Sequence, residues 1–171
     1  MSELETARLI LRKFEPGDSE FIYKLLNSPG WLKYIGQRGI KNEDDARGYI
    51  ENLIMPGYEK YGFGFYLMMR KDDGAQLGMC GLIKRDSLDD VDIGFAILPE
   101  YEGNGYTSEA AIATMEYAKN EVGLKRIAAI TVPYNKCSIK ILGKLGMKFE
   151  KMISIPNDPD ELMLYVKEFK N

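Results

Sequence analysis

The sequence contains no histidine among its 171 residues. Histidine is the usual general base near neutral pH and a common metal ligand. Its absence excludes nucleophile pairs such as Ser-His and Cys-His, and it excludes histidine-ligated metal centres. Any catalysis must therefore use carboxylates, hydroxyls, thiols, lysines or backbone groups, and we expect no metal site.

Cysteine is also scarce. Cys80 and Cys137 are the only two cysteines, they lie far apart in the chain, and no CxxC pair exists. Neither a disulfide framework nor a zinc knuckle can be built from them. Free thiols favour a reducing compartment, so we expect a cytoplasmic protein.

Long hydrophobic runs are missing as well. Residues 1–13 carry charges throughout and lack the apolar core of a signal peptide. No apolar run approaches the roughly 20 residues of a membrane-spanning helix. We therefore expect no membrane partner.

An excess of positive charge is the last feature that the chain lacks. Lysine and arginine number 23 against 26 acidic residues, which gives a net charge of -3, and the basic residues are scattered among acids. A nucleic-acid partner is not expected, because such proteins usually present a basic face. Hydrophobic residues make up 45% of the chain, and its length suits a single domain over residues 1–171 that buries roughly 70% of its unfolded surface.

The pattern of apolar and turn residues predicts an alternation of strands and helices. Strands are expected at residues 8–13, 63–70, 75–85, 91–98, 126–132, 148–155 and 161–169. Helices are expected at residues 18–27, 42–55, 106–122 and 136–145. Ser28, Pro29 and Gly30 should break the first helix and leave residues 31–39 irregular. This order predicts one α/β (α+β) domain around a mixed sheet of about seven strands with about four helices.

The densest functional signal is a glycine turn between a strand and a helix, at residues 93–110 (IGFAILPEYEGNGYTSEA). Gly103 and Gly105 stand just before the helix expected at Tyr106. A helix N-terminus has free N–H groups and a positive dipole end, and glycines allow a ligand to approach the backbone closely. The combination suits a pyrophosphate, although a plain tight turn remains the alternative.

Two common nucleotide-binding motifs do not fit this turn. A dinucleotide-binding turn needs a third glycine, where this chain has Ser108, and an acid at the end of the next strand. That strand instead continues into residues 131–135 (TVPYN), which contain no acid. A phosphate-binding loop of the GK[ST] type is absent too.

Residues 99–110 (PEYEGNGYTSEA) resemble the acetyl-coenzyme A motif of the GNAT superfamily of N-acetyltransferases, closest to the branch of ribosomal-protein N-terminal acetyltransferases. The family pattern has Gln or Arg, then Gly, then Gly or Ala at the positions of Glu102, Gly105 and Thr107, so two of these three residues depart from it. Residues 6–12 (TARLILR) and 135–147 (NKCSIKILGKLGM) resemble further segments of the same branch in the right order.

The resemblance implies a single-domain GNAT-like fold in which two neighbouring parallel strands splay apart and hold coenzyme A. By position these are residues 91–98 and 126–132. Backbone groups near Ile97 would pair with the pantetheine arm. The cofactor-binding residues implied by the resemblance lie along this strand, in the glycine turn and after the second strand: Ile97, Gly103, Asn104, Gly105, Tyr106, Thr107 and Asn135.

Asn135 and Ser138 have a structural interpretation beside the functional one. Asn135 resembles the family asparagine that binds the cofactor arm, yet an asparagine before a helix is also a good N-cap. Ser138 resembles the residue that protonates or hydrogen-bonds the leaving thiolate in this branch. Cys137 has no partner base in the sequence and is expected to be inert, because the family transfers the acetyl group directly.

Asp92 is the candidate general base, because related enzymes carry an acid at about this strand position. An ordinary surface aspartate or a strand-end salt bridge is the alternative. Family topology places Trp31 and Tyr34, with the segment from Tyr58 to Phe65, in the acceptor pocket, while core packing is the other interpretation of these aromatics.

The function implied is therefore acetyl transfer from acetyl-CoA to a primary amine by direct attack in a ternary complex. A non-catalytic coenzyme A-binding or regulatory module on the same fold is the alternative, and a nucleotide-dependent oxidoreductase is disfavoured by the missing acid. The partners expected are acetyl-CoA and an amine acceptor, either a protein N-terminus or a small molecule. The protein is expected to be a monomer or a homodimer.

Overall fold

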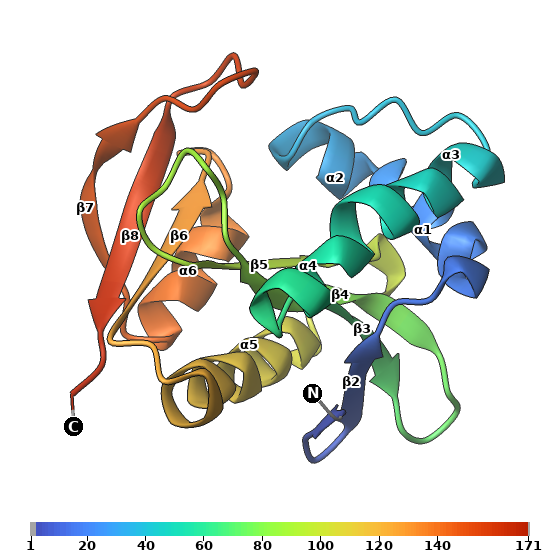
Figure 1. Cartoon of the computed structure of the whole chain (residues 1–171), viewed down its shortest axis with the longest axis horizontal. Helices are drawn as coiled ribbons and strands as arrows, with labels where there is room; N and C mark the ends of the chain where they lie inside the picture. Colours follow the sequence, from blue (N-terminus) through green and yellow to red (C-terminus); the bar gives the residue numbers. More distant parts are fainter. Residues whose placement is uncertain (1–2, 171) are drawn as a thin grey trace.

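The computed structural model describes residues 3–170, and in this part of the chain eight strands form one mixed sheet in the order β1-β2-β3-β4-β5-β6-β8-β7 (Figure 1). The strands are β1 Leu4–Glu5, β2 Leu9–Lys13, β3 Phe65–Arg70, β4 Gln76–Ile83, β5 Asp92–Ile97, β6 Arg126–Thr131, β7 Lys148–Ile153 and β8 Leu162–Glu168. The predicted mixed sheet is confirmed. The seven expected strands are all present, and the two-residue β1 is the additional one.

The centre of the sheet contains its only parallel pair among the described strands, β5 beside β6. These two strands are in register only at Asp92 and Ala128, where the Ala128 N–H also donates to the carbonyl of Val91 at 2.9 Å. Beyond that point they separate, while β5 stays paired with β4 along its whole length. The predicted splay of two central parallel strands is therefore present, and the gap opens toward their carboxyl ends.

The first helix follows from an amphipathic sequence. Helix α1 spans Ser19–Leu26, and its buried side chains include the predicted stripe of Phe21, Ile22, Leu25 and Leu26. Asp18, in the short 3-10 turn before α1, accepts hydrogen bonds from both terminal nitrogens of Arg12 on β2. The start of α1 is thereby tied to the edge of the sheet.

The segment 28–61 is more helical than the sequence pattern indicates. Helix α2 spans Pro29–Tyr34, where a break and irregular chain were expected. Helix α3 (Glu43–Tyr49) begins after the predicted cap Asn42, but the chain continues through a π-helical turn at Ile50–Ile54 into α4 (Met55–Tyr61). The predicted stop before Pro56 is wrong. Pro29 and Pro56 each occupy the first turn of a helix, where no N–H is needed and the fixed φ of proline fits.

The second half of the chain agrees with the prediction. Helix α5 (Tyr106–Tyr117) continues as a π-helical turn to Val122, and Gly123 ends it at φ 78°. Helix α6 (Lys136–Lys144) ends before Gly146, which has the left-handed φ of 79° expected of a residue after a helix end. Figure 1 shows α1–α4 above the right-hand half of the sheet and α5 below it.

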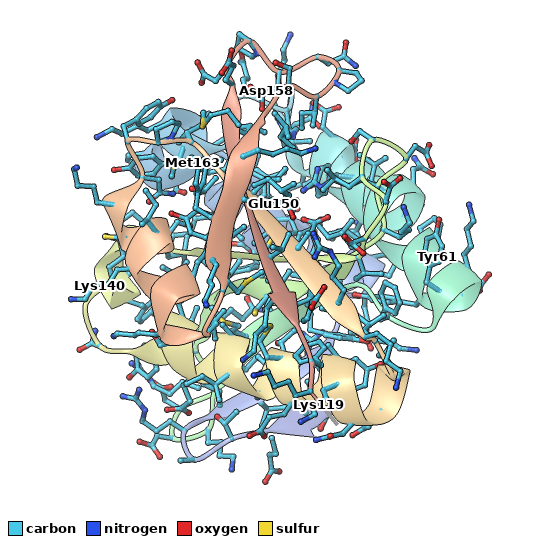
Figure 2. All side chains as sticks on the ribbon, turned by 90° about the vertical axis from the view of Figure 1, so that its left-hand side faces the viewer. Tyr61, Lys119, Lys140, Glu150, Asp158 and Met163 are labelled. Atoms are coloured by element: carbon cyan, nitrogen blue, oxygen red, sulfur yellow. The ribbon has the colours of Figure 1, made fainter. Side chains whose placement is uncertain are left out.

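One continuous hydrophobic core joins these layers. It includes Leu9 and Leu11 of β2, Met79 of β4, and Ala110 and Ala111 of α5, all 0% exposed. The β7–β8 hairpin forms the edge of the sheet opposite to β1, and Figure 2 shows Asp158 at the tip of its loop. The core makes the sheet a rigid support for the gap between β5 and β6.

Candidate active site

Two cavities meet where β5 and β6 separate. The larger cavity has a volume of about 710 Å³ and the smaller one about 410 Å³. Seven residues line both: Trp31, Tyr34, Ile35, Phe95, Ala96, Asn135 and Ser138. A ligand in one cavity can therefore touch a ligand in the other at this junction.

The smaller cavity is lined by the glycine turn before α5. Gly103 and Gly105 have φ values of 80° and 78°, which glycine adopts without the steric cost of a Cβ. No side chain caps the N-terminus of α5, and Gly105, Tyr106 and Thr107 all line the cavity. The first-turn N–H groups of a 12-residue helix are thus available to an anion.

Arg8 of the chain segment before β2 braces this turn from behind. Its guanidinium donates to the carbonyl of Asn104 at 3.0 Å and to the Glu109 carboxylate at 2.9 Å. Burial raises the pKa of Glu109, but hydrogen bonds from Thr6 and Arg8 outweigh this and hold that pKa below its usual range. The resemblance at residues 6–12 thus has a physical reason, because these residues fix the turn.

The side chains of Asn104 and Tyr106, two predicted residues of the turn, make contacts within the protein. The Asn104 amide donates to the carbonyls of Tyr101 and Glu102, and Asn104 does not line the smaller cavity. The Tyr106 ring lies 4.4 Å from the guanidinium carbon of Arg8. Thr107 is 9% exposed. Gly103 and Gly105, which have no side chains, line the smaller cavity with their backbone.

The free edge of β5 supplies extended backbone to the gap. The Leu98 N–H, just after β5, donates to the carbonyl of Leu77 in β4 at 2.8 Å. Backbone groups alternate in direction along a strand, so those of Ile97 and Phe95 face away from β4 and into the gap. Ile97 lines the smaller cavity, and its position suits pairing with an extended ligand.

Asn135 and Ser138 stand together at the junction. The Asn135 side-chain oxygen accepts the Ser138 N–H at 3.2 Å, so Asn135 is the N-cap of α6. Its amide NH₂ group remains a donor, which allows capping and ligand binding at once. Ser138 is half-buried and lines both cavities, whereas its exposed neighbour Cys137 lines only the smaller one.

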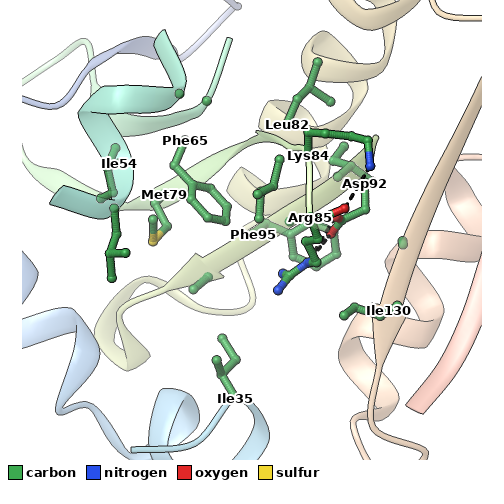
Figure 3. A pocket seen from close by; sticks show the side chains of 18 of the residues that line it. Ile35, Ile54, Phe65, Met79, Leu82, Lys84, Arg85, Asp92, Phe95 and Ile130 are labelled. Atoms are coloured by element: carbon green, nitrogen blue, oxygen red, sulfur yellow. Dashed lines mark hydrogen bonds and ion pairs between the residues drawn. The ribbon is translucent and has the colours of Figure 1, made fainter. Parts of the chain in front are cut away.

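Asp92 is buried at the point where β5 and β6 begin to separate. Its side chain is 1% exposed, lines the larger cavity and accepts from Arg85 Nε at 3.1 and 3.3 Å (Figure 3). Burial raises the pKa of Asp92 to about 6, although Arg85 opposes the rise. The alternative that Asp92 is an ordinary surface residue is wrong. The alternative that it forms a salt bridge is confirmed by its ion pair with Arg85. At about 3.3 Å per residue, Asp92 lies about 13 Å along the strand from Ala96 at the junction.

The aromatic residues expected near an acceptor divide into two groups. Trp31 and Tyr34 line both cavities, and Phe63 and Phe65 line the larger one. Tyr58 instead packs in the core, where its hydroxyl accepts the Phe14 N–H at 3.0 Å. The indole N–H of Trp31 is buried and has no hydrogen-bond partner in residues 3–170.

Glu102 and Thr107, the two residues that depart from the family pattern, both line the smaller cavity. A Cβ at Gly30 would stand 3.8 Å from a Glu102 carboxylate oxygen, so this side chain lies beside the first turn of α2. Lys140 and Lys144 of α6 also line the smaller cavity and add positive charge there. Sequence reasoning missed both lysines, although their own i, i+4 spacing, which places them on one face of the helix, was a usable signal.

Sequence reasoning also missed the cations of the larger cavity. Arg38, Lys60, Lys84 and Arg85 line it from three different segments that only the fold brings together. The remaining cysteine, Cys80, is buried, and burial raises the pKa of its thiol to about 12, so it is unreactive near neutral pH. Residues 3–170 contain no cluster of cysteine and acidic residues that could hold a metal ion.

A splayed parallel pair, an uncapped glycine turn and a second cavity at their junction are the features of an N-acetyltransferase. The chain belongs to the acetyltransferase (GNAT) domain family, whose family model matches residues 8–148. The resemblance found in the sequence is confirmed.

Named relatives agree with this assignment. The chain is 32% identical to the uncharacterized protein YkkB of Bacillus subtilis (strain 168), with 92% of each chain covered. It is 31% identical to the uncharacterized N-acetyltransferase YnaD of the same organism, covering 86% of this chain and 83% of YnaD. Among solved structures, the ribosomal L7/L12 α-N-protein acetyltransferase RimL in complex with coenzyme A has a TM-score of 0.81, covers 97% of each chain and shares 15% identity. That last likeness concerns the fold alone.

Within residues 3–170, none of the helices is both long and apolar enough to cross a membrane.

Proposed function

We propose that this protein transfers the acetyl group of acetyl-CoA to a primary amine by direct attack in a ternary complex. The observation that carries the proposal is the meeting of the two cavities at Ser138 and Asn135. The smaller cavity combines the α5 N-terminus with the free backbone edge of β5, which suits a pyrophosphate followed by an extended amide-bearing arm. The larger cavity is then left for the amine.

Acetyl-CoA would supply the acetyl group as an activated thioester. In this assignment Gly103, Gly105, Tyr106 and Thr107 offer backbone to the pyrophosphate, with Asn104 shaping the turn. The backbone of Ile97 and the amide of Asn135 hold the arm. Trp31 and Tyr34 border the place where the two ligands meet.

Two side chains act on the reacting groups. The Ser138 hydroxyl donates a hydrogen bond to the sulfur at the junction and stabilises the negative charge that develops there as coenzyme A leaves. Asp92 accepts the proton of the acceptor amine, and the span of about 13 Å along β5 requires that intervening water molecules carry it. Residues 1–171 then act as a single N-acetyltransferase domain.

Measuring release of free coenzyme A thiol from acetyl-CoA tests the proposal, with primary amines from four classes: a peptide N-terminus, an aminoglycoside, a polyamine and an amino acid. At least one class should support release well above the rate without amine. Calorimetric binding of acetyl-CoA without turnover on any amine would instead support the non-catalytic coenzyme A-binding module. Absence of coenzyme A binding would overturn both assignments.

A further inference from the structure

The wall of the larger cavity is richer in available cations than in available carboxylates. Of its acids, Asp92 is the buried one, and it is occupied by Arg85. Asp86 is exposed, and Asp158 lies on the β7–β8 loop at the end of the molecule (Figure 2). An acceptor that enters this cavity therefore meets no buried, unpaired carboxylate among the lining residues.

Two arginines of this wall, Arg38 and Arg85, have guanidinium N–H donors that are not used within the described chain. Arg85 binds Asp92 through Nε alone, and its two terminal nitrogens have no partner within residues 3–170. Figure 3 shows this guanidinium extending from Asp92 into the open part of the cavity, on the side that faces Ile35. Arg38 makes only one long contact in the described chain, from Nη1 to the Ile35 carbonyl at 3.5 Å.

A tyrosine, Tyr49, shares this cavity with the two arginines. Tyr49 of α3 lines the same cavity, and its hydroxyl has no hydrogen-bond partner among residues 3–170. Arg38, Tyr49 and Arg85 line one cavity, and while burial raises the pKa of Tyr49, the positive charges of the two arginines oppose the rise. Three donor groups from three separate segments thus line the same cavity.

Such a cluster of donors suits an anion. Arginine offers planar paired donors that match carboxylate and phosphate oxygens, and a tyrosine hydroxyl adds a third hydrogen bond. A polyamine or an aminoglycoside would bring further positive charge toward Arg38, Arg85 and Lys60, which is unfavourable.

We propose that the acceptor is an amine that also carries a carboxylate or phosphate group, which Arg38, the free terminal nitrogens of Arg85 and the Tyr49 hydroxyl hold while the amine faces Ser138. This inference rests on the proposed acetyl transfer and adds the charge class of the acceptor. Phe65 and Phe95, which line the same cavity, flank the apolar part of the acceptor.

Matched pairs of amines test the proposal in the thiol-release assay. Glycine, β-alanine and 4-aminobutyrate are compared with their amides, O-phosphoethanolamine with ethanolamine, and spermidine is added as a cation. The tripeptide amide Ala-Asp-Ala is compared with Ala-Asn-Ala, so that acidic peptides are distinguished from small molecules. We expect kcat/KM to be about 10- to 100-fold higher for the anionic member of at least one pair.

Amine basicity works against this expectation. A nearby carboxylate raises the pKa of an amine, so the amide has more free base at a given pH and would react faster if charge recognition were absent. Equal rates within every pair, or a preference for spermidine, would overturn the inference while leaving acetyl transfer intact. No turnover with any amine would overturn the proposed function and this inference with it.

Arg38→Gln provides the variant test. It should raise KM for the preferred anionic amine by about tenfold or more, leave the rate with its neutral partner unchanged, and leave acetyl-CoA affinity unchanged. Arg47→Gln is the matched control, since Arg47 is exposed on α3 and lines neither cavity. An equal loss for the charged and neutral amines would contradict the assignment.

A binding measurement does not depend on turnover. Trp31 is the only tryptophan and lines both cavities, so its fluorescence reports occupancy. With coenzyme A present, the preferred anionic amine should bind the wild-type protein at least tenfold more tightly than the Arg38→Gln variant. Equal dissociation constants would overturn the assignment of Arg38.

Discussion

Ser138 and Cys137 are neighbours in sequence, yet only Ser138 reaches both cavities. The Ser138 backbone N–H is held by Asn135, so replacing the hydroxyl does not remove the helix cap. This separation of backbone and side-chain roles makes the residue a clean target for substitution.

Ser138→Ala should lower kcat by about 10- to 100-fold with little change in the dissociation constant of acetyl-CoA. The reason is that the hydroxyl acts on the sulfur only as negative charge develops there. Steady-state kinetics and calorimetry check this, with Cys137→Ala as the control that keeps full activity. A loss of acetyl-CoA affinity with turnover retained would assign Ser138 a binding role instead.

Asp92 gives the site its own pH dependence. Burial raises its pKa to about 6, so the group is protonated below that pH and cannot accept a proton, whereas above it the carboxylate is available. The wild-type rate should therefore rise as pH increases through about 6.

Asp92→Asn should remove the part of that rise that comes from Asp92, so that the rate follows only the fraction of free amine, and should lower the rate by about tenfold or more near pH 7. The deficit should shrink below pH 6, where wild type loses its base, and again at high pH, where free amine becomes abundant. A pH–rate profile from pH 5 to 10 checks both limits. A constant ratio of wild type to variant over that range would remove Asp92 from proton transfer.

At the level of secondary-structure elements, the turn before α5 depends on two backbone positions that only glycine adopts easily. Gly105 has φ 78° at the start of α5, and Gly123 has the same φ at the end of the π-helical turn. The two positions carry the same backbone strain on substitution, but only Gly105 lines the smaller cavity.

Gly105→Ala and Gly123→Ala should each destabilise the protein by about 1–2 kcal/mol, because an L residue is strained at positive φ. Only Gly105→Ala should also weaken acetyl-CoA binding, by about tenfold or more, because relief of the strain at φ 78° shifts backbone that lines the smaller cavity. Chemical denaturation and calorimetry measure the two effects separately. Equal acetyl-CoA affinities in the two variants would show that the turn does not bind the ligand.

The elements also show where sequence reasoning succeeded. The seven predicted strands and the helices of the second half were correct because their apolar periods and glycine stops are local properties. The errors at Pro29 and Pro56 share one cause. Proline was taken as a helix breaker, whereas the first turn of a helix tolerates it, and only packing of the helices on the sheet decides which role applies.

At the scale of the whole molecule, a ligand that binds only the folded state stabilises it. At about 100 times its dissociation constant, acetyl-CoA should add about 2.7 kcal/mol. For a chain of this size that corresponds to a rise in Tm of about 5–10 °C.

Thermal denaturation with increasing acetyl-CoA checks this shift. NAD and NADP serve as controls and should leave Tm unchanged, because the turn lacks the features of a dinucleotide-binding site. A shift with NAD of similar size would favour the oxidoreductase alternative that the sequence disfavoured.

The sequence by itself determined the fold class, the family, the glycine turn and the cap at Asn135, since each depends on residues that are close together in the chain. It did not determine the surroundings of Asp92, because the path of the β4–β5 connection that carries Arg85 and the burial of Asp92 are both properties of the packed molecule. It also did not reveal the cation-lined cavity. Arg38, Tyr49 and Arg85 come from three segments, and only the tertiary structure brings their charges and hydroxyl together.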